Sequence, residues 1–294
     1  MKTIIKDIAY LVAGGKTGQI QRNVDMLIED GMITGIGRDL QNDQAMLLDA
    51  SGMIVYPGLI NTHHHFYQVL TRNIPEIQNL ELFDWLLWLY QRWRHLTPRM
   101  LYDASMVAMG ELVQFGCTTM VDHHYVFPKY QSGMLEAQFE AAEKLGVRLH
   151  ACRGSMSLGE SRGGLPPDDL VQNATEILED SQRLIDAFHD PSINSFRQII
   201  LAPCSPFSVD AELMRHSAQL ARDNSVLLHT HLAETEDEVQ YCLDAFGRRP
   251  LLIWKIWDGL EMMFFLHMEY ISMIRSWIYW PKLKREWLIA PFPI

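Results

Sequence analysis

Residues 57–68 read PGLINTHHHFYQ, an apolar run that ends in three consecutive histidines and a polar tail. The apolar residues predict a buried strand, and alternate side chains of an extended chain project to the same face. His63 and His65 are therefore expected to point together, with His64 directed away from them. Two imidazoles side by side at the end of a strand are typical of half a zinc site. A polar loop with hydrogen-bonded histidines is the alternative.

A second stretch, LLHTHLAET at residues 227–235, repeats this pattern. It again ends an apolar run in histidine, and Glu234 follows His231 by three residues. Thr235 and Glu238 have the spacing of a capping box, so a helix is expected to begin here. One interpretation of Glu234 is a surface residue in the first turn of that helix, where a negative charge suits the helix dipole.

Strand and helix patterns alternate after His65. Predicted strands lie near residues 58, 118, 148, 199 and 227, and a helix pattern follows each of them. This alternation indicates a parallel (β/α) barrel, of which five of the eight units are visible. Short β-prone segments with glycine turns predict a small β-sandwich before it. The chain thus divides into an N-terminal domain (1–56), a partial barrel (57–250) and a tail (251–294).

The predicted strand ends carry the candidate metal ligands. Enzymes with this barrel collect their functional residues just beyond the carboxyl ends of the strands, and His63, His65 and His231 all fall there. We therefore expect these three side chains to bind one divalent metal ion together. His123 and His124 close another strand. Packing or supporting roles are expected for them, because a mononuclear site already has its histidines, with metal ligation as the alternative.

Both histidine stretches, taken together, resemble the amidohydrolase superfamily. Longer matches, NTHHHFYQ (61–68), ACRGSMSLGES (151–161) and LAPCSPFSV (201–209), are similar to one branch: the 8-oxoguanine deaminases and the enzymes that hydrolyse hydroxylated s-triazines. The resemblance runs from the N-terminus to about Pro250. It implies a (β/α)8 TIM-type barrel, here truncated after about five strands, with an N-terminal β-sandwich domain. It also implies one zinc ion per chain and Glu234 as proton shuttle.

The resemblance implies hydrolytic deamination of a purine-like base, with 8-oxoguanine converted to urate and ammonia. A hydroxy-s-triazine or guanine is the alternative substrate. Gln68 and Arg153 each stand just past a strand and are expected to bind the carbonyl and ring edges of the base, with structural hydrogen bonding as the alternative. Aromatic residues expected either to wall the base or to pack in the core are Phe66, Tyr67 and Trp85.

Composition narrows the class of partner. A formal net charge of −11 offers no basic stripe for phosphates, so no nucleic acid partner is expected, although a single nucleobase fits. The four cysteines lie far apart, which suits a reducing compartment. Charges near the N-terminus and the lack of a membrane-length apolar run predict a cytoplasmic protein without a membrane partner. A homo-oligomer is left open.

The tail after Pro250 departs from the family pattern. That pattern places a histidine after the sixth strand and a ligating aspartate after the eighth, and neither occurs here in a recognisable context. Residues 251–294 instead hold five of the eight tryptophans and one glycine. The chain as printed is therefore expected to be a non-catalytic fragment that binds metal weakly at most. If it is active, His267 or Asp258 would be the substitute ligand.

The genetic code offers an explanation for this tail. Methionine and tryptophan each have a single codon that ends in G, so the codon formed with the next residue's first two bases is partly determined. Read this way, the junction of residues 254 and 255 gives glutamate, and that of 257 and 258 gives glycine. The junction of residues 267 and 268 can encode the missing histidine. We therefore expect a one-base displacement between Gly247 and Leu252.

Overall fold

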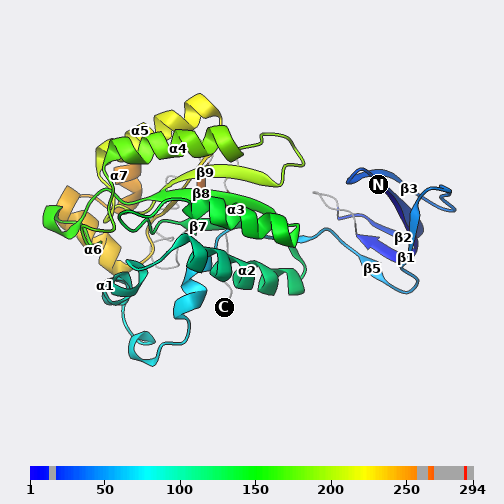
Figure 1. The fold of residues 1–294 in the computed structure, drawn as a ribbon, viewed down its shortest axis with the longest axis horizontal. Helices are drawn as coiled ribbons and strands as arrows, with labels where there is room; N and C mark the ends of the chain where they lie inside the picture. Colours follow the sequence, from blue (N-terminus) through cyan, green and yellow to red (C-terminus); the bar gives the residue numbers. More distant parts are fainter. Residues whose placement is uncertain (13–17, 257–263, 268–287, 290–294) are drawn as a thin grey trace. The chain divides into compact units, whose positions relative to one another are not determined.

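The structure, a computed structural model, describes residues 1–12, 18–256, 264–267 and 288–289 (Figure 1). The chain divides into two compact units, Met1–Leu59 and Ile60–Ile294. Across the described ranges, no helix combines the length and the apolar character that a membrane crossing requires.

The first unit is a five-stranded sheet in the order β3-β2-β1-β4, with β5 beside β1. Its strands are β1 (Lys2–Val12), β2 (Ile20–Glu29), β3 (Met32–Gly37), β4 (Met46–Asp49) and β5 (Ile54–Val55). Side chains from β1 and β2 form its small core, which includes Ile8, Leu11, Val24 and Met26. The expected N-terminal β domain is confirmed, as one sheet over the described residues.

The second unit contains a seven-stranded sheet in the order β12-β11-β10-β9-β8-β7-β6. Its strands are β6 (Leu59–Asn61), β7 (Cys117–His124), β8 (Arg148–Ser155), β9 (Arg197–Pro203), β10 (Leu227–His231), β11 (Phe264–His267) and β12 (Leu288–Ile289). The pairs from β7 through β12 are parallel. This is the α/β sheet of a truncated TIM-type barrel, as predicted.

The tail adds to this sheet. The resemblance implied a barrel truncated after about five strands, the last of them β10, but β11 pairs with β10 in parallel. In that register, the backbone of His267 lies opposite that of His231. Phe264, Phe265 and Leu266 are three consecutive apolar residues, and phenylalanine is enriched in strands. Asp258 and most of the tail lie outside the described residues.

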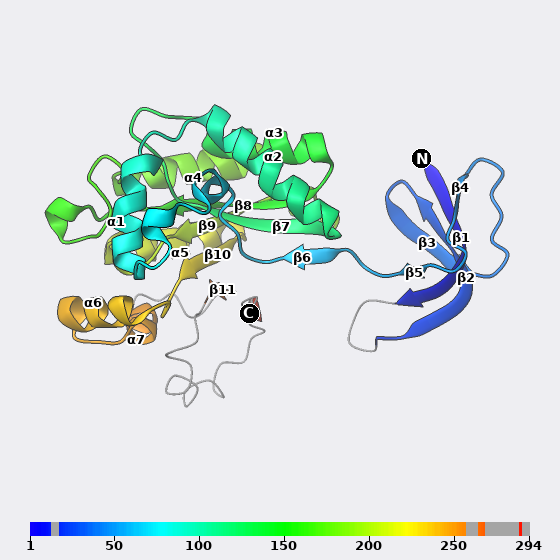
Figure 2. The ribbon, with the colours of Figure 1, turned by 90° about the horizontal axis from the view of Figure 1, so that it is seen from below.

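Helices run alongside the strands of this sheet, as Figures 1 and 2 show for α2, α3 and α4. They are α1 (Leu82–Trp93), α2 (Pro98–Gln114), α3 (Met134–Leu145), α4 (Ala174–Phe188), α5 (Ala211–Asn224), α6 (Glu236–Phe246) and α7 (Pro250–Ile256). Short 3-10 helices cover Phe66–Thr71, Pro75–Ile77 and Glu160–Arg162. Thr97 caps α2, since its side chain accepts a hydrogen bond from Met100 N.

Side chains of alternate residues along each strand lie on opposite faces of the sheet. On β9, Ile199 and Leu201 join the large core that the helices complete. Ile200 and Ala202 belong instead to a second cluster, with Val121 and Cys152 of the neighbouring strands. Both faces of the sheet are therefore buried, which explains why these strands read as nearly continuous apolar runs.

A buried histidine ends β7. The His124 ring packs edge-on against Phe127 and Tyr67, with ring centroids 4.9 Å and 5.3 Å away. Burial, together with the nearby charge of Arg153, lowers the pKa of His124 to about 3. The folded protein therefore holds this ring neutral at pH values where an unfolded chain would protonate it.

We expect the substitution His124→Phe to make the protein less sensitive to acid. Because the folded pKa is depressed, the unfolded chain takes up a proton below about pH 6.5 while the folded chain does not. Stability is then lost as pH falls toward 3, by up to about 1.4 kcal/mol per pH unit. Urea unfolding at pH 7.5 and 5.5 measures this slope, which should be smaller in the variant.

The exposed His216 on α5 gives the matched control, because its ring meets water in both folded and unfolded chains. The substitution His216→Phe should keep the pH slope of the parent. Equal slopes in the parent and His124→Phe would contradict this account of the buried ring.

Candidate metal centre

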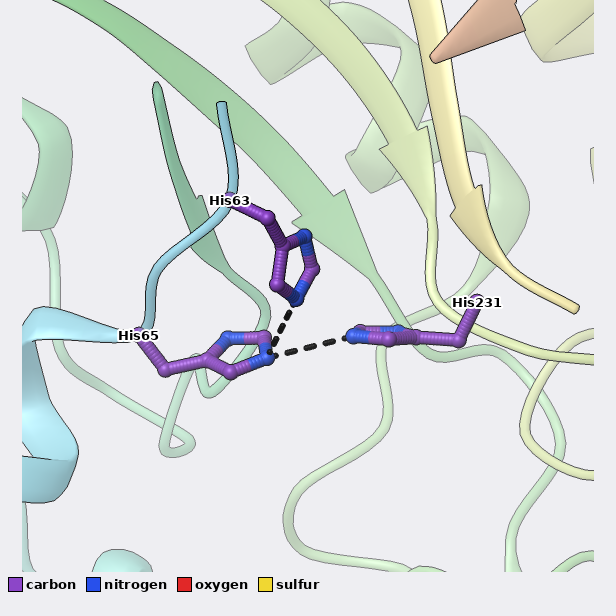
Figure 3. A group of neighbouring side chains, drawn as sticks. All are labelled: His63, His65 and His231. Carbon is purple, nitrogen blue, oxygen red and sulfur yellow. Dashed lines mark hydrogen bonds between the residues drawn. The ribbon is translucent and has the colours of Figure 1, made fainter. Parts of the chain in front are cut away.

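Three histidines predicted from the sequence converge at one edge of the sheet. His63 and His65 follow β6, and His231 is the last residue of β10. The Nε2 atom of His65 lies 3.1 Å from Nε2 of His63 and 3.1 Å from Nε2 of His231 (Figure 3). Parallel strands end at the same edge of a sheet, so residues 166 positions apart in sequence meet here.

Backbone carbonyls fix which nitrogen of each ring faces the centre. The Nδ1 atom of His65 lies 2.6 Å from the carbonyl oxygen of His123, and that of His231 lies 3.0 Å from the carbonyl oxygen of Cys204. A carbonyl oxygen only accepts, so each Nδ1 carries the hydrogen. In the neutral rings, both Nε2 atoms then present lone pairs to each other.

The third ring follows the same pattern through a fourth histidine. Nδ1 of His63 lies 2.9 Å from Nε2 of His229, so His63 can donate there and keep its own Nε2 lone pair for the centre. Three lone pairs directed at one point call for a shared electron-pair acceptor, and a divalent cation supplies one. The donor set therefore fits a metal ion.

Two further groups of potential ligands overlap with this one. They are His63, His123 and His229, and His123, Cys204 and His231. Burial raises the pKa of the Cys204 thiol to about 12, so the thiol and not the thiolate is the form present before any metal ion binds. Burial lowers the pKa of the His123 ring well below its usual value. The group of His63, His65 and His231 is the one whose members all line a cavity.

This cavity, of about 440 Å³, also brings Gln68 and Glu234 beside the three histidines. Its wall is largely apolar and aromatic, with Leu82, Trp85, Leu86, Tyr90, Tyr125 and Phe207 among its residues. Phe66 and Tyr67 lie in the core instead. A flat heterocycle with polar edges suits such a space.

The structure does not bring Arg153 to this cavity. Its guanidinium group donates to Asp180 at 2.7 Å and to Gln172 at 2.8 Å, and it also donates to the carbonyl of Gly154. It lies 3.8 Å over the ring of Phe127 and is 1% exposed. These contacts tie β8 to α4, which favours the structural role that the sequence left open.

A buried acid that sequence reasoning missed supports the segment after β6. The Asp122 carboxylate accepts hydrogen bonds from Phe66 N at 2.6 Å and from Gln138 Nε2 at 2.5 Å. Burial raises its pKa to about 7. Asp122 thus joins three elements, namely β7, α3 and the residue directly after His65. In the sequence, the position of Asp122 directly before the paired histidines of β7 is the one feature that could have indicated this supporting role.

Comparisons with known proteins agree with this geometry. The model of the amidohydrolase family matches residues 54–252. The chain is 50% identical over 229 residues to "8-oxoguanine deaminase" of Pseudomonas aeruginosa, covering 77% of this chain and 51% of that protein. It is 36% identical over 262 residues to "Hydroxydechloroatrazine ethylaminohydrolase" of a Pseudomonas species, covering 85% and 54%. The chain thus spans about half the length of the curated relatives it matches.

A solved structure extends the likeness to the arrangement of the elements. The atrazine chlorohydrolase TrzN of Arthrobacter aurescens, complexed with zinc, superposes with a TM-score of 0.90 at 28% identity. The match covers 98% of this chain and 64% of that one. With a family model that spans most of the partial barrel, and with histidines converging at its strand ends, the chain belongs to the amidohydrolase family.

Proposed function

We propose that this chain carries the metal-binding part of a hydrolytic deaminase that acts on a purine-like base, with 8-oxoguanine as the first candidate. One observation carries the proposal: three imidazole Nε2 atoms converge in a cavity that Glu234 and Gln68 also line. The relative named 8-oxoguanine deaminase, at 50% identity, supports the choice of substrate.

His63, His65 and His231 would hold one zinc ion through their Nε2 atoms. Three neutral imidazoles suit zinc, and the solved relative is named as a complex with zinc. A divalent ion in such a site lowers the pKa of water toward neutrality and so supplies hydroxide at physiological pH. The carbonyls of His123 and Cys204 keep the rings in the tautomer that this role requires.

Other residues of the cavity would transfer protons and bind the ring. A carboxylate oxygen of Glu234 takes a proton from the attacking water and passes it to the neighbouring ring nitrogen as the carbon–oxygen bond forms. It then carries the proton of the new hydroxyl group to the exocyclic amine, so that the carbon–nitrogen bond breaks, ammonia leaves and the ring carbon becomes a carbonyl. The Gln68 amide can donate to a ring carbonyl and accept from a ring N–H. Trp85 offers an apolar face for the ring.

Hydroxylated s-triazines are the second candidate substrate class. Two comparisons favour them: the relative named hydroxydechloroatrazine ethylaminohydrolase, and the zinc complex of atrazine chlorohydrolase. Both classes place an amine on a flat ring beside carbonyl or nitrogen edges. The cavity's lining suits either class, so only turnover separates them.

A different class of function is a non-catalytic fragment that binds metal without turnover. The chain spans about half of its curated relatives, and most of residues 251–294 lie outside the described ranges. The one-base displacement inferred from the codon junctions stays a prediction, which sequencing of the stretch between Gly247 and Leu252 would test. Stop codons soon after this stretch in the displaced frame would contradict it.

Metal binding tests the three histidines first. We expect about one zinc ion per chain by isothermal titration and atomic absorption. The substitutions His65→Ala and His231→Ala should each weaken zinc binding by more than about 100-fold. Loss of a hydrogen bond that only supports a ligand typically costs roughly 10–100-fold, and loss of the ligand itself should cost more. His64→Ala is the control, since His64 lies between two ligands without joining them. Equal affinities in all three variants would contradict the assignment.

Turnover tests the role of Glu234. The proposed deaminase function predicts that the zinc-loaded chain releases ammonia from 8-oxoguanine, guanine or a hydroxylated s-triazine, whereas a non-catalytic fragment releases none. Glu234→Gln should bind zinc normally but lose about 10²–10⁴-fold in kcat, because the proton carrier is gone. Glu236→Gln, which removes an exposed charge two residues away, is the control. Zinc binding without turnover of any of the three substrates would favour the fragment alternative.

A further inference from the structure

Both oxygens of one buried carboxyl group hold the segment that carries Glu234. Glu238 lies in the first turn of α6 and is 0% exposed. Its Oε1 accepts from the backbone N–H of Ala233 at 2.9 Å, and its Oε2 accepts from the backbone N–H of Glu234 at 2.7 Å. The carboxylate thus spans two successive amides between β10 and α6.

This arrangement differs from the capping box that the sequence predicted. In a capping box, the Thr235 side chain would accept a hydrogen bond from the helix and Glu238 would reach the amide of Thr235. Thr235 makes no such side-chain bond, and Glu238 reaches past it to the two residues before. The carboxylate of Glu238 therefore fixes the two residues before the N-cap, Ala233 and Glu234, and leaves the amide of Thr235 unbound by it.

The held segment contains an unfavourable backbone turn. Ala233 has a φ of +58°, in the left-handed region that residues with a Cβ seldom adopt. His231 is fixed two residues earlier by β10, and Glu234 follows one residue later. The direction in which Glu234 leaves the strand is therefore set by this turn, and the turn persists while its two amides are held.

Burial of this acid is costly for the folded chain. Among the described residues, no lysine or arginine forms an ion pair with Glu238, and burial raises its pKa to about 7. A buried acid without a cation is expensive, so stability alone does not account for it. Residues at such a cost are typical of functional sites.

We propose that Glu238 is a positioning residue: its carboxylate fixes the turn at Ala233 and thereby aims Glu234 into the cavity with the three histidines. The inference rests on the proposed role of Glu234 as proton carrier. Glu238 itself does not line the cavity, so it acts through the backbone of Glu234.

Amide hydrogen exchange of the whole chain tests the contact directly. Glu238→Gln keeps the shape of the side chain but replaces one acceptor oxygen by an NH₂ group, so one of the two amides loses its partner. Exchange at Ala233 or Glu234 should accelerate by about tenfold or more, with the rest of the protein unchanged. Glu236→Gln, in the same helical turn but exposed, should leave both amides protected. Unchanged exchange in Glu238→Gln would overturn the proposal.

Kinetics separate positioning from a merely structural role. In the zinc-loaded chain, Glu238→Gln should lower kcat by about tenfold or more with little change in KM. In a Glu234→Gln background, the same substitution should cost nothing further, because the residue it aims is already disabled. Equal losses in both backgrounds would overturn the proposal.

Two controls keep the outcomes distinct. If the parent chain shows no turnover, the proposed function fails, and hydrogen exchange alone decides the role of Glu238. If Glu238→Gln fails to fold, Glu238→Asp takes its place, since the shorter carboxylate cannot reach both amides at once. Protection of both amides in that variant would contradict the inference.

Discussion

The hydrogen bonds between imidazole Nδ1–H groups and backbone carbonyls are the constraint on which this site depends. His65 donates to the carbonyl of His123, and His231 donates to that of Cys204. These carbonyls belong to β7 and to the residue after β9, so the sheet itself selects the tautomer of each ring. Without them, the rings could turn or present N–H groups to the centre, and no shared ligand set would exist.

Two buried acids extend the same principle to the connecting segments. Asp122 holds the amide of Phe66, directly after His65, and Glu238 holds the amides of Ala233 and Glu234. Burial raises the pKa of both acids to about 7. Each acid fixes a chain segment where it leaves a strand, which is where the barrel fold concentrates its chemistry. Rigid elements thus position the short irregular segments that carry the functional groups.

Much of this arrangement follows from local signals in the sequence. Strands β6 to β10 and helix α3 were predictable because apolar runs end at glycines and capping residues, and the alternation of histidines identified the converging rings. Long-range contacts were not predictable in this way. The direction of Arg153 depends on Asp180, which is 27 residues away, and Glu238 reaches back past its own helix cap. The pairing of β11 with β10 likewise depends on tertiary contacts that composition does not reveal.

X-ray absorption at the zinc edge tests the central claim most directly, because imidazole and thiolate ligands differ in bond length. For the zinc-loaded chain, we expect three imidazole nitrogens at about 2.0–2.1 Å and no sulfur at about 2.3 Å. That result would select His63, His65 and His231 over the overlapping group that contains Cys204. A sulfur ligand, or fewer than two imidazoles, would contradict the account.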